Sequence, residues 1–187
     1  TTAQRDGSPA SGYTRPNSDL LAVESYLGSE WVPMRTVQGA RVATTSGTSF
    51  DFTNIPAWVT RIDIMPRGVS LSGTDSLLIQ LGGTSGFQVT GYISTSIRIS
   101  SAASATGDTN TTGFVVSLGV AANIWTGRIT IHKVRDGSRA FIQDHNGKTS
   151  TSVVAWGGGD VVMTEELTQI RIKTDGANSF DAGEIVM

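Results

Sequence analysis

The sequence contains no cysteine. A chain without thiols forms no disulfide framework, binds no metal through thiolates and has no thiol nucleophile. Histidine occurs only twice, glutamate five times and lysine three times among the 187 residues, whereas helical bundles are rich in glutamate and lysine. No run approaches the ~18 consecutive apolar residues of a membrane-spanning helix, so we expect no membrane insertion.

Charge is also scarce. Charged residues make up 16% of the chain, well below the roughly 25% of an average soluble domain. The formal net charge is −2, and this lack of a basic excess argues against nucleic acid as a partner. The chain begins Thr1-Thr2 without an initiator methionine, so we expect a fragment or processed product of a longer polypeptide.

Serine, threonine and glycine are abundant where other soluble domains have more charged residues. The chain has 21 serines, 24 threonines and 22 glycines. This composition predicts a protein rich in strands and turns, with a surface that carries hydroxyl groups more than ions.

The sequence divides into two parts, residues 1–38 and 39–187. The first part contains three of the five prolines and predicts a turn, a strand over 20–26, a tight reversal at Leu27-Gly28-Ser29 and a returning strand over 30–32. Its large apolar side chains are Tyr26 and Trp31. Because fewer than ~40 residues seldom fold alone, we expect this stem or connector to pack on the larger domain or on copies of itself.

The second part predicts an antiparallel β-sandwich, similar to a jelly roll. Apolar and polar residues alternate over 58–64, 129–132 and 170–173, which places Trp58, Ile62 and Ile64 in the core. Residues 102–112 are expected to form a long exposed loop, and Gly157-Gly158-Gly159-Asp160 to join two strands. The predicted strands are 40–43, 49–52, 58–65, 77–81, 88–94, 114–118, 127–133, 140–143, 152–156, 161–163, 167–173 and 184–187.

No pattern of catalytic residues stands out. The nucleophile motif Gly-x-Ser-x-Gly is absent. His132 is expected on the polar face of a strand and His145 in a turn, although a serine triad assembled from distant residues stays open. Most aspartates adjoin glycine or asparagine, which is typical of turns, and the acidic pair Glu165-Glu166 is expected to be solvated. We therefore expect a protein that is not an enzyme.

Metal and cofactor sites are not expected either. Asp175-Gly176-Ala177-Asn178 and Asp144-His145-Asn146 offer oxygen ligands, but neither has the alternating oxygens and distal glutamate of a calcium loop.

Two tryptophans suggest a site for a neutral glycan. Trp125 and Trp156 each precede small residues at a predicted strand end, where an indole ring can stack on the apolar face of a sugar. The loop residues expected to bond sugar hydroxyls beside them are Asp108, Asn110, Asp144 and Asn146. The alternative is that both tryptophans close the core and the four polar residues form turns.

Several stretches resemble bacteriophage tail-fibre and other virion fibre proteins. Thr1-Thr2-Ala3-Gln4-Arg5, a proline-containing turn at Pro9, Gly12-Tyr13-Thr14-Arg15 and Tyr26 to Trp31 have the order and spacing of a fibre module. Asp6-Gly7 and Pro16 depart from its usual residues. Residues 52–62, 68–70, 78–82, 90–92 and 180–183 resemble a C-terminal domain of such fibres.

The resemblance implies a non-enzymatic structural protein on the surface of a phage particle. Such fibres are generally homotrimers that contact other virion proteins and attach to the host, where a surface glycan is a candidate receptor. Two alternatives stay open. One is a capsid head fibre or decoration protein with no specific receptor, and the other is a glycan depolymerase, which requires paired carboxylates or a triad in one cleft.

Overall fold

The chain folds into two compact units, residues 1–39 and 40–187. A computed structural model describes residues 9–18, 22–34, 37–39 and 41–187. The motif at residues 1–5 and the start of the strand predicted over 20–26 lie outside these residues. No helix occurs in the described part of the chain, so none there is long and apolar enough to cross a membrane.

The first unit is a three-stranded antiparallel sheet in the order β1-β2-β3. The predicted hairpin is present as β2 (Ala22–Tyr26) and β3 (Trp31–Pro33), and β1 (Thr14–Asn17) adds a third strand that was not predicted. Gly28 has a φ of 89°, a conformation that glycine adopts without strain, and so permits the tight reversal.

One face of this small sheet is packed. Tyr26 and Trp31 are buried with ring centroids 5.5 Å apart, and the Arg15 guanidinium lies 3.9 Å from the centre of the Trp31 ring. The opposite face presents Val23 and Met34 to solvent. The two predicted anchors therefore pack against each other within the unit.

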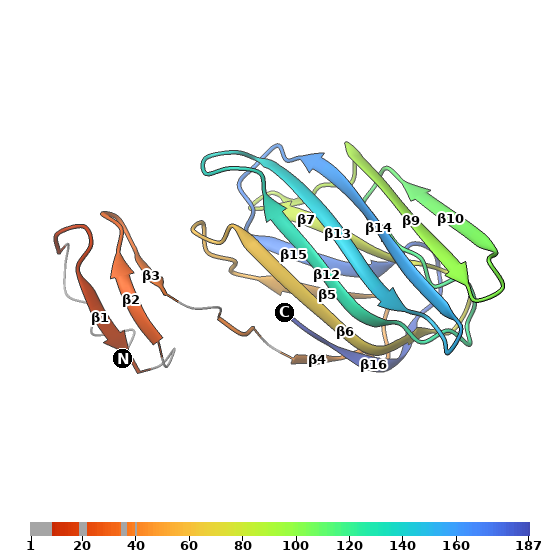
Figure 1. Ribbon diagram of the computed structural model, residues 1–187. Coiled ribbons are helices and arrows are strands. Elements are labelled where there is room, and N and C mark those ends of the chain that lie inside the picture. Colours follow the sequence, from red (N-terminus) through yellow and green to blue (C-terminus); the bar gives the residue numbers. More distant parts are fainter. Residues whose placement is uncertain (1–8, 19–21, 35–36, 40) are drawn as a thin grey trace. The chain divides into compact units, whose positions relative to one another are not determined.

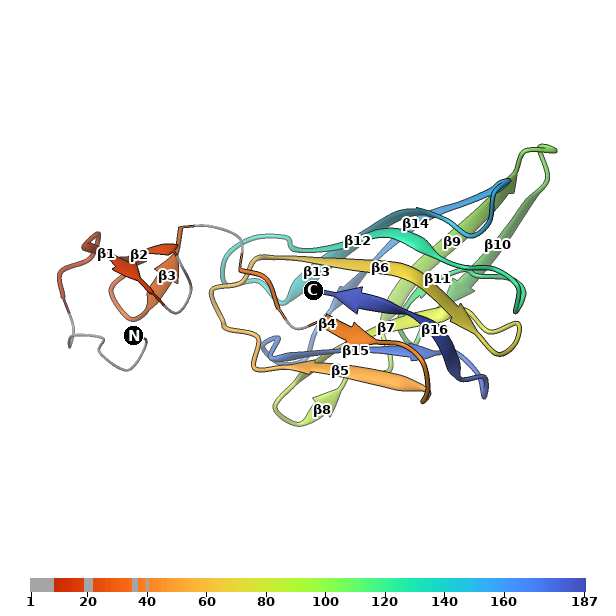
Figure 2. The same ribbon diagram turned by 90° about the horizontal axis from the view of Figure 1, so that it is seen from below.

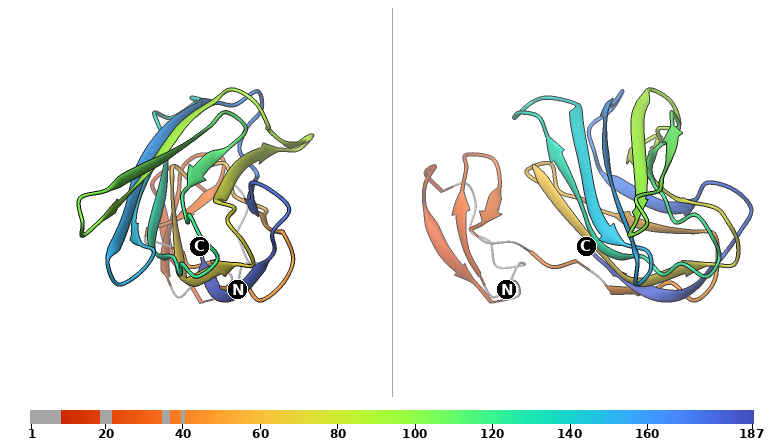
Figure 3. Two further views of the ribbon diagram at one scale, coloured as in Figure 1. Left: turned by 90° about the vertical axis from the view of Figure 1, so that its right-hand side faces the viewer. Right: turned by 45° about the vertical axis from the view of Figure 1, so that its right-hand side comes forward.

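The second unit is an all-β antiparallel sandwich, which confirms the predicted fold class. An eight-stranded sheet has the order β10-β9-β14-β13-β12-β6-β16-β4, and a five-stranded sheet contains β11-β7-β15-β5 with β8 paired to β7. Figures 1 and 2 show the two layers, with β5, β7 and β15 facing the larger sheet. Figure 3 shows how successive strands of the larger sheet rotate relative to one another, as strand twist requires.

The strands of this unit are short to medium in length. Their bounds are β4 Arg41–Ala43, β5 Ser49–Thr53, β6 Arg61–Leu71, β7 Leu77–Gly83, β8 Gly86–Phe87, β9 Tyr92–Ser100, β10 Ala105–Asn110, β11 Phe114–Val116, β12 Thr126–Lys133, β13 Ala140–Lys148, β14 Val153–Val162, β15 Gln169–Thr174 and β16 Phe180–Val186.

A single apolar core fills the space between the sheets. Alternate residues point inward at Ile129 and Ile131 of β12 and at Ile62 and Ile64 of β6, and the facing strands β7 and β15 supply leucine and isoleucine. Val69 and Leu71 continue the core of β6 beyond an irregularity in its pairing with β16. The largest fully buried side chains are Trp125, Tyr92, Phe114, Phe180, Ile64, Leu71, Leu77, Ile79, Leu81, Leu118, Ile129 and Ile131.

Three predictions about local structure were wrong. Residues 105–110 form edge strand β10, which pairs with β9, within the stretch expected to be a loop. The predicted glycine loop lies inside one continuous strand, β14, and the predicted turn at His145 lies inside β13. Glycine and asparagine are common in turns, but here the pairing with two neighbouring strands outweighs that preference.

The core position assigned to Trp58 was also wrong. Trp58 lies in a turn in which the Val59 amide donates to the Pro56 carbonyl at 3.0 Å, and its side chain is only half-buried. Strand β6 begins at Arg61, so Ile62 and Ile64 occupy the core without it. The alternation was correct, but Pro56 belongs to a turn that delays the strand.

We expect Trp125→Ala to destabilise the sandwich far more than Trp58→Ala. Trp125 is 0% exposed, so its truncation should cost about 3–5 kcal/mol, the usual loss for a large core aromatic. Trp58→Ala removes a half-buried turn residue and should cost about 1 kcal/mol. Urea unfolding of both variants measures the difference. Equal losses of stability would contradict this assignment of the core.

Candidate functional site

The structure separates the six residues predicted to bind a glycan. Trp125 is not at an exposed loop edge as predicted: it forms a bridge with Val69 at the start of β12 and is fully buried. Its ring lies edge-on to His145, with centroids 6.5 Å apart. The alternative of a core residue is therefore correct for Trp125.

Asp108 and Asn110 lie on β10, on the side of the larger sheet opposite to Trp156. Asp108 is paired with Ser96, a buried residue of β9, whereas Trp156 is paired with Ile97. The Ser76 hydroxyl donates to the Asp108 carboxylate at 3.1 Å, and the Thr112 amide donates to Asn110 Oδ1 at 2.7 Å. Both side chains thus stabilise local structure and share no surface with Trp156.

The other three residues lie together on the outer face of the larger sheet. Trp156 is on β14 and is paired directly with Asn146 on β13, and Asp144 is paired with Gly158. All three side chains are exposed, and Trp156 keeps 51% of its surface accessible to solvent. A tryptophan exposed in the middle of a central strand is unusual, because large aromatic side chains are mostly buried.

The outer surface beside Trp156 is bare. Within 4 Å of the position a Cβ would take on Gly158, only two main-chain atoms of Gln143 occur. Gly158 is two residues from Trp156, about 7 Å along the strand on the same face. The position of Trp156 is therefore followed, on the same face of the strand, by an open place whose floor is main chain.

Hydrogen-bonding groups surround this open place. Thr95 on β9 and Asp144 on β13 are the direct partners of Gly158 on its two sides. Asp160 follows on the same strand and is exposed. We call this set the Trp156 face: Trp156, Asn146, Asp144, Gly158, Thr95 and Asp160.

Aliphatic side chains border the Trp156 face at both ends. Ile97 and Val154 adjoin the indole, and Ile93 and Ile142 flank Asp160 across the neighbouring strands. The polar side chains of the Trp156 face thus lie between two aliphatic groups. Neighbouring strands in this region are about 5 Å apart.

An ion pair and its hydrogen-bond partner continue the outer face toward β6. Arg61 donates to both carboxylate oxygens of Asp63 at 3.0 Å, and Thr130 donates to the same carboxylate at 3.0 Å. Partial burial raises the pKa of Asp63, but the Arg61 and Thr130 hydrogen bonds and the nearby positive charges lower it further, so it lies below its ordinary value. Asp63 is therefore ionised and held by its partners at neutral pH.

The inner face behind Trp156 holds a buried polar cluster. His145 Nε2 lies 2.8 Å from Ser96 Oγ, and His145 Nδ1 lies 3.0 Å from Gln143 Nε2. Burial lowers the pKa of His145 from 6.5 to about 4, so the ring is neutral at pH 7. All three side chains are buried, which removes His145 from contact with any substrate at the surface.

The glycine run is required by this packing. A Cβ on Gly157 would lie 2.6 Å from His145 Cε1 and 2.2 Å from the Thr95 carbonyl oxygen. A Cβ on Gly159 would lie 2.4 Å from the Ile93 carbonyl oxygen. No side chain therefore fits at these positions, because the β9 main chain lies too close at both and the His145 side chain of β13 lies too close at Gly157.

The sequence interpretation missed Gly158, Thr95 and Asp160. The glycine run was interpreted as a loop, which hid the alternation of β14. The residues on both sides of the glycines do alternate as a strand requires. Trp156, Asp160 and Val162 are at even positions and exposed, whereas Ala155 and Val161 are at odd positions and buried. Within the described residues, no group of three or more histidine or acidic side chains is placed to hold a metal ion.

Comparison with known proteins gives no further guide to function. No family model, no curated protein and no solved structure matches the chain.

We expect stability to fall as the pH drops from about 6.5 to about 4. The unfolded chain binds a proton at His145 near its ordinary pKa of 6.5, whereas the folded chain does so only at about 4. The neutral ring therefore contributes stability above pH 6.5, and this contribution, about 3 kcal/mol, is lost progressively on acidification. Urea midpoints measured across this range test the prediction.

The control is His145→Gln, which retains hydrogen-bonding groups but does not titrate. Its midpoint should change less over the same range. An equal acid dependence in the variant would assign the effect to carboxylates.

Proposed function

We propose that this chain is a non-enzymatic structural component of a bacteriophage virion, a tail-fibre or receptor-binding domain that attaches to a glycan on the host surface. The resemblance of the sequence to fibre proteins, over residues 1–5, 8–15 and 20–33 and in the stretches 52–62, 68–70, 78–82, 90–92 and 180–183, supports the phage origin. The exposed Trp156, beside the bare surface over Gly158, is the observation that carries the binding role.

The chemistry of the Trp156 face suits a neutral sugar. An indole ring offers a flat apolar surface, and a few oriented polar groups beside it fix the orientation of a small ligand. Asn146 supplies both donors and acceptors, and Asp144 supplies acceptors for sugar hydroxyls. The Thr95 hydroxyl donates to the Asp108 carbonyl at 3.3 Å, so its oxygen is available to the sugar as an acceptor. The main-chain floor at Gly158 lets a ring approach the sheet closely.

A depolymerase would need more than this face offers. Glycoside hydrolysis uses one protonated and one ionised carboxylate on the two sides of the scissile bond. Asp144 and Asp160 are diagonal neighbours across β13 and β14, with Cβ atoms about 7 Å apart, but both are exposed on an open sheet surface. Binding without cleavage is the better match to that environment.

The first unit supports an oligomeric fibre. Its sheet buries Tyr26 and Trp31 on one face and leaves Val23 and Met34 exposed on the other. A unit of 39 residues is too small to be stable alone, and association of three copies through the uncovered face supplies the missing burial. A homotrimer on the particle surface, in contact with other virion proteins, follows from this proposal.

Replacing Trp156 with alanine should weaken glycan binding by at least about tenfold, because the stacking surface is lost. Stability should change by about 1 kcal/mol or less, since the side chain is half exposed. Binding to an array of bacterial surface polysaccharides and urea unfolding are measured on the same protein.

A matched control is Ile124→Ala, which truncates a half-exposed apolar side chain away from the Trp156 face. Its binding should match that of the unchanged protein. Undiminished binding by the Trp156 variant, or release of reducing ends from a bound polysaccharide, would contradict the proposal.

The full chain should form a trimer at micromolar concentration. Removal of residues 1–39 should leave a folded sandwich that associates more weakly, because the sandwich has its own core. Multi-angle light scattering measures both masses. A monomeric full chain would refute the trimer.

A further inference from the structure

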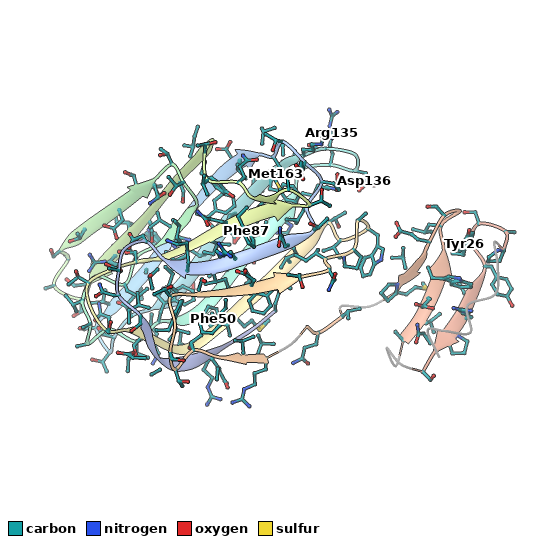
Figure 4. The ribbon with its side chains drawn as sticks, turned by 180° about the vertical axis from the view of Figure 1, so that it is seen from behind. Tyr26, Phe50, Phe87, Arg135, Asp136 and Met163 are labelled. Atoms are coloured by element: carbon teal, nitrogen blue, oxygen red, sulfur yellow. The ribbon has the colours of Figure 1, made fainter. Side chains whose placement is uncertain are left out.

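Two hollows adjoin each other at one end of the sandwich, where three connections meet. The larger has a volume of about 450 Å³ and the smaller about 130 Å³. The larger is lined by Thr53, Asn54, Ile55, Gly83, Thr84, Thr168 and Gln169. The smaller is lined by Gly83, Ser85, Gly86, Phe87, Gln88, Met163, Thr164 and Glu165. Figure 4 labels Phe87 and Met163 of the smaller hollow.

The larger hollow has a neutral polar lining. Its side chains carry hydroxyl and amide groups, and Ile55 is its apolar member. Within the described part of the chain, the Thr168 hydroxyl and the Asn54 amide oxygen have no hydrogen-bond partner, and Gln169 uses Nε2 to donate to the Gly83 carbonyl at 2.7 Å. Its volume is within the range of about 300–1,000 Å³ typical of small-ligand sites.

A fixed carboxylate lies between the two hollows. Glu165 accepts hydrogen bonds from the Thr84 hydroxyl at 3.1 Å and the Ser85 amide at 3.0 Å. These bonds, those of Ser85 first, lower the pKa of Glu165, so it is ionised at neutral pH. A Cβ on Gly83 would lie 2.4 Å from a Glu165 carboxylate oxygen, so the absence of a side chain there makes room for the carboxylate.

The walls are held in place by bonds between separate connections. The Ile55 amide donates to the Thr168 carbonyl at 2.9 Å, and Thr164 donates its amide to Gln88 Oε1 at 2.9 Å. Asn54 has a φ of 61°, in the left-handed region that asparagine tolerates in turns and glycine adopts freely. These hydrogen bonds fix the loops that form the two hollows relative to one another.

We propose that these two hollows form a second binding site, which takes a neutral saccharide lying across Gly83. Free hydroxyl and amide groups match the hydroxyl groups of a sugar, and the ionised Glu165 accepts from them without acting as an acid. The lining of both hollows contains one carboxylate, which excludes the two-carboxylate mechanism of glycoside hydrolysis at this site. The site shares no residue with the Trp156 face, so its existence does not depend on the proposed function.

Saturation-transfer NMR with four neutral disaccharides, lactose, cellobiose, maltose and sucrose, tests this site on the full chain. At least one should receive saturation from the protein. Thr168→Val and Asn54→Gly should each weaken its binding about five- to tenfold, the loss expected for one hydrogen bond. Asn54→Gly also relieves the positive φ, so the fold should not be lost.

A control variant tests whether the loss is specific to this site. Thr106→Val removes an exposed hydroxyl on β10 and should leave disaccharide binding unchanged. The proposal is overturned if none of the four disaccharides binds. It is equally overturned if Thr168→Val and Asn54→Gly bind as well as the unchanged protein while thermal unfolding shows all variants folded, because binding would then take place elsewhere, as at the Trp156 face.

Discussion

The close approach of β14 to its two neighbours is the constraint on which both faces of the larger sheet depend. Strand β14 lies near enough to the β9 main chain that only glycine fits at positions 157 and 159. On the inner face, the missing side chains make room for His145 and its hydrogen-bonded partners. On the outer face, Gly158 leaves the sheet bare beside Trp156. One run of three glycines therefore creates both the buried polar cluster and the open surface.

The rest of the sandwich holds this arrangement in place. The apolar core between the sheets fixes β12 and β13, whose register sets Asn146 opposite Trp156. The stability of the folded sandwich depends on pH through His145. The packing that excludes water from this side chain also lowers its pKa. At one end of the sandwich, hydrogen bonds such as that from the Thr164 amide to Gln88 join separate loops. These loops place hydroxyl groups around one carboxylate, that of Glu165. Two surfaces suited to neutral ligands thus arise from one scaffold.

The sequence predicts the fold class and most strands, because apolar residues alternate clearly in stretches such as 129–132 and 170–173. It predicts Trp156 as a candidate but misplaces Trp125, since both tryptophans precede small residues and only pairing across the sheets distinguishes them. Gly158 is missed because glycine alone indicates a turn. The hollows around Glu165 cannot be predicted from the sequence, because Glu165 and the residues that bind its carboxylate are 80 and 81 positions apart in the chain. In each case the position of the residue depends on pairing between strands or loops that are distant in the sequence, and no local pattern shows that pairing.

A crystal structure of the full chain with a polysaccharide that it binds tests the central claim most directly. The account predicts a sugar ring parallel to the Trp156 indole and above Gly158, with its hydroxyls within hydrogen-bond distance of Asn146, Asp144 or Thr95. It also predicts that the Trp156 face stays open to solvent in the assembled oligomer. A structure in which a second copy of the chain covers Trp156, or in which the sugar lies elsewhere and leaves this face empty, would contradict it.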